Sequence, residues 1–124
     1  MCSVLMSIKP IFVQSILSGE KVFEFRKKAC KKSIDRILIY STVPVQKVVG
    51  EAEVESVLIE SPAVLWKLTH EGAGIDKEFF DSYFENRNEA VAYKLTNVKK
   101  YNKPITLLDL GIKVAPQSYQ YIEI

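Results

Sequence analysis

Apolar and polar residues alternate with a period of two in several stretches of the chain, and other stretches are rich in β-branched and aromatic residues. Both patterns are typical of β-strands. One stretch alternates Glu51, Glu53 and Glu55 with smaller or apolar residues, so one face of that strand is expected to be exposed. The predicted strands are one that ends near Ser7 and those over residues 22–27, 34–41, 48–59, 89–99 and 119–124.

Helices are predicted between these strands. A two-turn helix over residues 11–17 has Pro10 at its first position and Gly19 just past its end. Ser61, which a proline follows, begins a second helix over residues 63–70. These end signals are independent of the hydrophobic pattern, so they strengthen both helix predictions.

A third helix follows the glycine-rich break at residues 72–74, and Asp76 can cap its first turn. Its aromatic residues recur at spacings of three and four, which favours one apolar stripe. A short turn or helix is predicted over residues 107–110. We expect three phenylalanines of the stripe, and the tryptophan of the preceding helix, to lie in the core: Phe79, Phe80, Phe84 and Trp66.

Strands that are interrupted by helices, without a repeated βα unit, favour an α+β fold over a doubly wound sheet. We expect a small, mainly antiparallel β-barrel with peripheral helices. The 124 residues are 48% hydrophobic, so residues 1–124 are predicted to form a single domain. No apolar run approaches the roughly 20 residues that span a bilayer, and residues 1–9 lack the features of a signal peptide. We therefore expect a soluble, cytoplasmic protein without a membrane partner, with Cys2 and Cys30 as reduced thiols.

Residues 19–26 bring a lysine, a glutamate and an arginine together where a helix gives way to a strand. In an extended chain Phe23 and Phe25 share one face, and Glu24 and Arg26 share the other. Two such charged residues, with Cα atoms roughly 7 Å apart, can either find partners across a sheet or form part of a charged site. The pattern alone leaves both interpretations open.

Gly19, Lys21, Glu24 and Arg26 match, position for position, the signature Gly-x-Lys-x-x-Glu-x-Arg, and the chain thereby resembles the ASCH family of the PUA-like superfamily. The similarity extends over nearly the whole chain, to residues 115–119 near its end. The resemblance implies a PUA-like barrel that recognises RNA or a modified nucleotide, with no cofactor and no metal. It also implies a cationic cleft between the first helix and the barrel, with these ligand-binding residues: Lys9, Lys21, Glu24, Arg26, Tyr40, Gln117 and Ser118.

Such a cleft would be suited to a nucleotide. A carboxylate beside cations stays ionised and can accept a hydrogen bond from the exocyclic amine of a base, while the cations hold a phosphate or a carbonyl oxygen. This binding chemistry needs no cofactor.

The net charge of +2 conceals a segregation of charge along the chain. Residues 21–36 hold seven basic and two acidic residues, a local charge of +5, and residues 94–103 add four lysines and no acid. If these two basic segments lie close together, they form a patch suited to phosphates; the alternative is a solvated loop that keeps the protein soluble. The predicted phosphate contacts are Lys27, Lys28, Lys31 and Lys32.

Hydrolysis without a metal is the alternative function. His70 is the only histidine and there is no cysteine cluster, so neither a zinc site nor a Ser-His-Asp site is expected. Some ASCH proteins are similar to amidohydrolases that act on acetylated cytidine with a lysine, a threonine and a glutamate. Their counterparts here are Lys21, Glu24 in the threonine position, and Glu71, so the presumed nucleophilic hydroxyl is missing.

A ribonuclease-like branch of the same family uses a tyrosine, a lysine and a serine. The corresponding candidates are Tyr40, Lys47 and Ser118. Without a histidine, cleavage of RNA would need a lysine or tyrosine of perturbed pKa. A second alternative is a protein-interaction or regulatory module that uses the acidic helical segment over residues 71–89.

Overall fold

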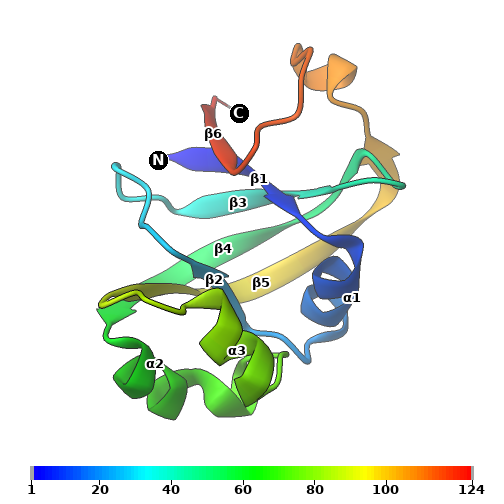
Figure 1. Ribbon diagram of the computed structural model, residues 1–124. Helices are drawn as coiled ribbons and strands as arrows, with labels where there is room; N and C mark the ends of the chain where they lie inside the picture. The colour runs from blue at the N-terminus through cyan, green and yellow to red at the C-terminus, as the bar shows by residue number, and fades with distance from the viewer. Residues whose placement is uncertain (1, 124) are drawn as a thin grey trace.

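Six strands and three α-helices make up residues 2–123, the part of the chain that this computed structural model describes (Figure 1). The strands are β1 (Ser3–Ile8), β2 (Phe23–Arg26), β3 (Arg36–Ser41), β4 (Lys47–Glu60), β5 (Ala90–Ile105) and β6 (Tyr119–Ile122). The helices are α1 (Pro10–Ser18), α2 (Pro62–Thr69) and α3 (Lys77–Tyr83), with short 3-10 turns η1 (His70–Gly72) and η2 (Leu108–Leu110).

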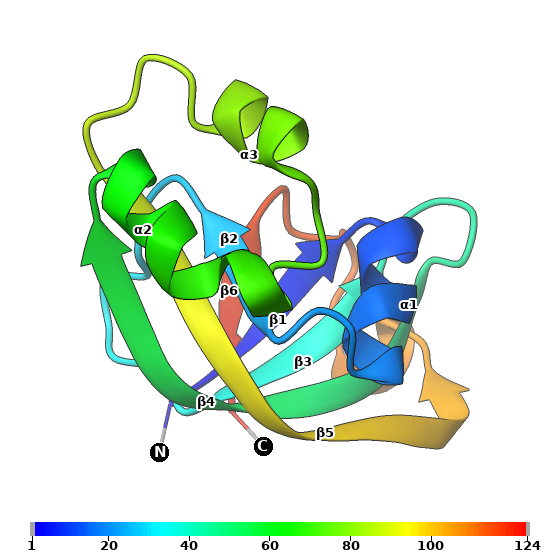
Figure 2. The ribbon, with the colours of Figure 1, turned by 90° about the horizontal axis from the view of Figure 1, so that it is seen from below.

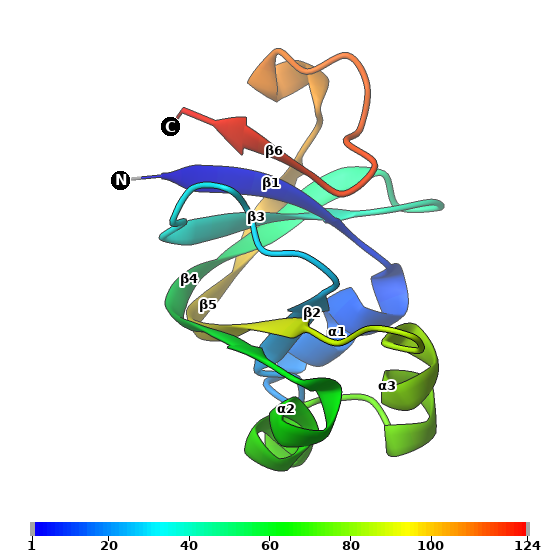
Figure 3. The same ribbon diagram turned by 60° about the vertical axis from the view of Figure 1, so that its left-hand side comes forward.

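The strands form one sheet in the order β2-β5-β4-β3-β1-β6, which curls into a half-barrel (Figure 2). Four of the five pairings between these strands are antiparallel, and β1 with β3 is the parallel one. β1 also pairs with β6, with Ser3 opposite Ile122, so the first and last strands are neighbours (Figure 3). The predicted α+β fold, built on a mainly antiparallel barrel, is confirmed.

α1 packs on the inner face of the curled sheet. Pro10 occupies its first turn, and Gly19 ends it with a φ of 89° and an N–H that donates to the carbonyl of Ile16. Val13 and Ile16 are buried among apolar side chains of the strands. The end signals in the sequence therefore fix both ends of a helix that forms one side of the site described below.

α2 and α3 cover the end of the half-barrel near β2 (Figure 2). The Ser61 hydroxyl accepts a hydrogen bond from the backbone N–H of Val64 at 3.4 Å, and an Asp76 carboxylate oxygen accepts one from that of Phe79 at 2.8 Å. A second buried cluster lies beneath these helices and includes Phe23, Phe25, Leu65, Phe80 and Phe84. None of the helices within residues 2–123 is long and apolar enough to cross a membrane.

Two expectations about the elements are wrong. β5 runs on to Ile105, beyond the predicted end at residue 99, because the chain passes Asn97 with a φ of 48° and shifts register against β4 instead of leaving the sheet. Phe79 is 42% exposed and does not lie in the core. Phe80 and Phe84 are four residues apart and both face the core, whereas Phe79 is one residue before Phe80 and therefore points about 100° away from it.

The two basic segments meet only in part: Phe23 pairs with Lys94, but most lysines of the second segment lie further along β5. Arg26 pairs with Val91 at one end of β5, whereas Lys100 pairs with Gly50 nine positions further along the strand. At roughly 3.3 Å per residue this separation approaches 30 Å. Lys99, Lys100 and Lys103 therefore lie away from the loop that follows β2, whereas Lys94 lies beside β2 itself.

Candidate functional site

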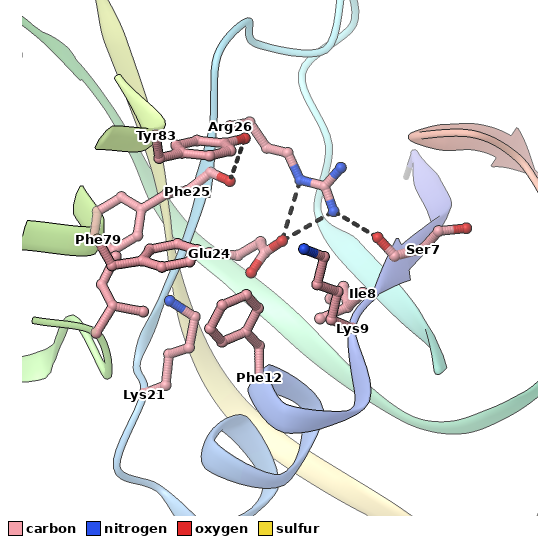
Figure 4. Close-up of a pocket in the computed structure, with 11 residues that line it drawn as sticks. Ser7, Ile8, Lys9, Phe12, Lys21, Glu24, Phe25, Arg26, Phe79 and Tyr83 are labelled. Atoms are coloured by element: carbon pink, nitrogen blue, oxygen red, sulfur yellow. Dashed lines mark hydrogen bonds and ion pairs between the residues drawn. The ribbon is translucent and has the colours of Figure 1, made fainter. Parts of the chain in front are cut away.

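A pocket of about 150 Å³ lies between α1, α3 and the ends of β1 and β2 (Figure 4). A cavity of this volume holds about one benzene-sized ring. It combines aromatic walls with charged groups, and its lining is Ser7, Ile8, Lys9, Phe12, Lys21, Glu24, Phe25, Arg26, Ile75, Phe79 and Tyr83. All four residues that were expected around the signature motif and the first helix, namely Lys9, Lys21, Glu24 and Arg26, contribute to this one pocket.

Arg26 bridges the gap between β2 and β1, where no pairing of the described strands closes the half-barrel. We call this gap the seam. β2 pairs with β5 alone among the described strands, so its other edge faces β1 without a hydrogen-bonded ladder. The guanidinium crosses this gap and donates from Nη2 to the Ser7 carbonyl at 2.9 Å and from Nη1 to the Ser118 hydroxyl at 3.0 Å. One side chain thus joins β2 to β1 and to the segment that precedes β6.

Glu24 is the anion of the site. The side chains of Glu24 and Arg26 are 8% and 14% exposed, and Nε and Nη2 of Arg26 donate to Oε2 of Glu24 at 3.1 and 2.9 Å. Within residues 2–123 no hydrogen bond reaches the other carboxylate oxygen, Oε1. The carboxylate therefore keeps one acceptor for a ligand, and the strand face that carries both charges is buried in the site.

Lys21 is buried, with only 3% of its surface exposed. Its Nζ donates to the Ala73 carbonyl at 2.8 Å and lies 4.6 Å from the ring centroid of Phe25 and 5.4 Å from that of Phe12. Burial lowers the pKa of Lys21 from the ordinary 10.5 to about 8, although the nearby Glu24 carboxylate opposes part of this shift. The ammonium group is thus poised to lose its proton only slightly above neutral pH.

Lys21 is expected to make the protein more stable as the pH rises above 8. Between its folded pKa of about 8 and the ordinary 10.5, the unfolded chain binds more protons at this residue than the folded chain does. From about pH 7.5 to about pH 9.5 its contribution to the free energy of unfolding should rise by about 2 kcal/mol. Urea unfolding at both pH values should show this increment in wild type but not in Lys21→Met, and identical pH dependence of the two proteins would contradict it.

α3 supplies one wall of the pocket through Phe79, which was expected in the core, and Tyr83. The Phe79 ring meets the Phe12 ring edge-on, with centroids 5.4 Å apart, so the two rings connect α3 to α1 across the pocket. Tyr83 forms the side next to Arg26, and burial raises the pKa of its phenol. The helical spacing of the aromatic stripe contained these residues, but it did not indicate which of them face a pocket.

A second hollow of about 490 Å³ adjoins the pocket and shares Arg26 and Tyr83 with it. Lys27 lies over the Tyr83 ring, with its Nζ 5.0 Å from the centroid. We call this the basic hollow, since five cations and no acid line it: Arg26, Lys27, Lys28, Lys31 and Arg87, with Ala29, Tyr83, Ser118 and Tyr119. Three of the four predicted phosphate contacts therefore lie together, and Arg87, from the loop before β5, joins them. The fourth, Lys32, lies instead over the ring of Tyr121 at 4.9 Å.

The remaining candidates lie outside the pocket. Tyr40 is 4% exposed and packs in a third buried cluster on the other face of β3. Lys47 is exposed at the start of β4, and Glu71 lies in η1 beside a different hollow. Ser118 contacts Arg26 and borders the basic hollow, and its exposed neighbour Gln117 lines neither space. Tyr40, Lys47 and Ser118 are thus not brought together around the pocket that contains Lys21.

Within residues 2–123 there is no group of three or more His, Cys, Asp or Glu side chains that could hold a metal ion. The side chains of the pocket offer both polar and aromatic contacts. Lys21 and Arg26 supply donors, Glu24 supplies an acceptor, and Phe12 and Phe79 supply faces on which a flat ring can stack. This combination suits a planar ligand with a polar edge.

Comparison with known proteins identifies the family. A curated relative from Zymomonas mobilis, named an ASCH domain-containing ribonuclease, is 31% identical over 105 residues, which are 84% of this chain and 68% of that protein. The chain belongs to the ASCH family. A family model described as a domain of unknown function, DUF365, matches residues 1–123 of this ASCH protein. The resemblance that the signature motif indicated is confirmed.

Solved and longer relatives extend the comparison. The crystal structure of ASCH from Zymomonas mobilis superposes with a TM-score of 0.88 at 29% identity, and the match covers 98% of this ASCH chain and 87% of that one. Large ribosomal subunit protein uL22 of Ureaplasma parvum serovar 3 is 30% identical over 122 residues. This chain spans 39% of the length of that uL22 protein.

Proposed function

We propose that this ASCH protein binds single-stranded RNA, or a modified nucleotide, by taking one unpaired base into the pocket and the adjoining phosphates into the basic hollow. The observation that carries the proposal is the juxtaposition of the two spaces. A pocket sized for one ring opens beside a hollow with five cations and no acid, and Arg26 and Tyr83 line both. Sequence-tolerant binders of single strands combine these two features, aromatic faces for bases and cations along the backbone.

Family evidence supports a role that involves RNA. The relative from Zymomonas mobilis is named a ribonuclease. Lys21, Glu24 and Arg26, which line the pocket, are the charged residues of the family signature. The free Oε1 of Glu24 can accept from the exocyclic amine of a base, and Lys21 can donate to a ring nitrogen or carbonyl. Recognition of this kind needs no cofactor.

Binding of RNA is expected to weaken with salt, with a slope of log affinity against log salt near roughly −3, which corresponds to about four phosphate contacts on a single strand. Fluorescence anisotropy with a labelled mixed-sequence RNA measures it. Removing three cations of the basic hollow, in the variant Lys27→Ala, Lys31→Ala, Arg87→Ala, should bring the slope to about −1.

A matched variant removes three cations elsewhere. This control variant combines Lys99→Ala, Lys100→Ala and Lys103→Ala. The three lysines lie at the far end of β5, so the same change in net charge should leave the slope near that of wild type. Equal slopes for the two triple variants, or a wild-type slope near zero, would remove the basic hollow from the proposal.

Metal-independent hydrolysis of RNA or of a modified nucleoside is the second candidate function. The observation that favours it is Lys21, a buried lysine with a pKa of about 8 beside Glu24 in the pocket, because a group that titrates near neutral pH can transfer protons. The anisotropy samples are then run on a denaturing gel. If Lys21→Met abolishes cleavage and Lys47→Met does not, the reaction takes place in the pocket. If the RNA stays intact with every protein, the domain binds RNA without cleaving it.

A further inference from the structure

We propose that the pocket selects pyrimidine bases over purines by size, and that Phe12 and Phe79 set this limit. The inference rests on the proposed RNA binding and adds which nucleotides occupy the site. It is carried by the dimensions and the packing of the pocket walls. Its volume of about 150 Å³ matches one six-membered ring, whereas a purine adds a fused second ring.

The inner wall cannot yield to a larger ligand. Phe25 is 7% exposed, and its ring makes edge contacts with Phe80 at 5.3 Å and with Phe84 at 6.1 Å between centroids. Both partners lie in the buried cluster beneath α2 and α3. Moving Phe25 would disturb a close-packed core, so the pocket has a fixed depth.

The polar groups of the site are held at that depth. Lys21 is tied to the Ala73 carbonyl, and Glu24 is tied to Arg26 by two hydrogen bonds. Neither group can swing outward to meet a base that remains at the entrance. A base must therefore enter the pocket before its edge reaches them, and the volume at this depth matches a single ring.

Phe12 and Phe79 restrict the width. Their rings touch edge-on at 5.4 Å, and because they belong to α1 and α3, they join two elements across the pocket (Figure 4). Admission of a second ring requires this contact to open. Phe79 is 42% exposed and outside the core, so it is the wall that a substitution can remove without loss of the fold.

The test uses four labelled RNAs of equal length in which one central nucleotide is U, C, A or G and the flanking positions are abasic, so that the phosphates are constant. Wild type is expected to bind the U and C forms roughly tenfold or more tighter than the A and G forms, the size of discrimination that a close-fitting apolar pocket achieves. Phe79→Ala should bring the ratio of purine to pyrimidine dissociation constants close to one. Leu68→Ala, at a site on α2 that is 55% exposed and outside the pocket, should keep the wild-type ratio.

Two results would overturn the size limit: equal affinities of wild type for the four RNAs, or an unchanged ratio in Phe79→Ala. The ratio separates the effect on size selection from a general loss of stacking, because loss of stacking would weaken the purine complexes at least as much as the pyrimidine complexes and could not lower the ratio. Failure of wild type to bind any of these RNAs, together with the mixed-sequence RNA, would instead reject the proposed function itself.

Discussion

Arg26→Ala is expected to lower the free energy of unfolding by about 3 kcal/mol, because removal of one member of a largely buried ion pair leaves the other charge without compensation. Glu24 would lose both hydrogen bonds to its Oε2, and the contacts of Arg26 with Ser7 and Ser118 across the seam would disappear as well. Urea unfolding at neutral pH measures the change.

A double variant tests the reason for this loss. Glu24→Gln combined with Arg26→Ala leaves a neutral amide in place of the stranded carboxylate, so the double variant should be more stable than Arg26→Ala alone. Strictly additive losses would show that the uncompensated charge of Glu24 is not the cause. A loss below about 1 kcal/mol in the single variant would mean that solvent already screens the pair, as it does for exposed ion pairs.

Gly74→Ala is expected to cost about 3 kcal/mol of stability. Gly74 has a φ of 68°, a conformation that costs an L-residue roughly 1–2 kcal/mol, and a Cβ atom there would lie 2.4 Å from Cβ of Lys21. Relief of the overlap must displace Lys21 or the loop that holds it, which adds a cost of the size seen for overpacked cores, roughly 1–3 kcal/mol. The substitution should also weaken binding of RNA, since Lys21 moves.

Gly111→Ala is the matched control. Gly111 has a similar φ of 73°, but a Cβ atom there meets nothing within 4 Å. Its cost should therefore be the conformational one alone, about 1 kcal/mol, with RNA binding unchanged. Equal losses in the two variants would show that the loop gives way freely and that Gly74 does not hold Lys21 in place.

The sequence predicted the helix ends correctly, because the residues that mark them act on neighbouring backbone groups. Pro10 and Gly19 marked the ends of α1, and Ser61 and Asp76 marked the starts of α2 and α3, because each acts on backbone groups within one turn. The alternation in β2 indicated a charged strand face, and the signature motif indicated the pocket residues around it.

Tertiary contacts decided the rest. Burial of Lys21 depends on the loop at Ala73 and Gly74, some fifty residues away in the chain, so no local pattern could indicate its lowered pKa. The helical spacing of α3 grouped Phe79 with Phe80 although they face different surroundings. The meeting of Arg87 with Lys27 likewise depends on how the loop before β5 returns to β2.

The pairing of β1 with β6 also bears on how such a domain can be used. Ser3 lies opposite Ile122 at the edge of the sheet that is remote from α2 and α3 (Figure 3). A host polypeptide could enter and leave at this one place, with the domain set into a surface loop or attached at either side, and the sheet would stay intact. Under the proposed function, the protein that carries the domain would then decide where in the cell the nucleotide-binding pocket acts.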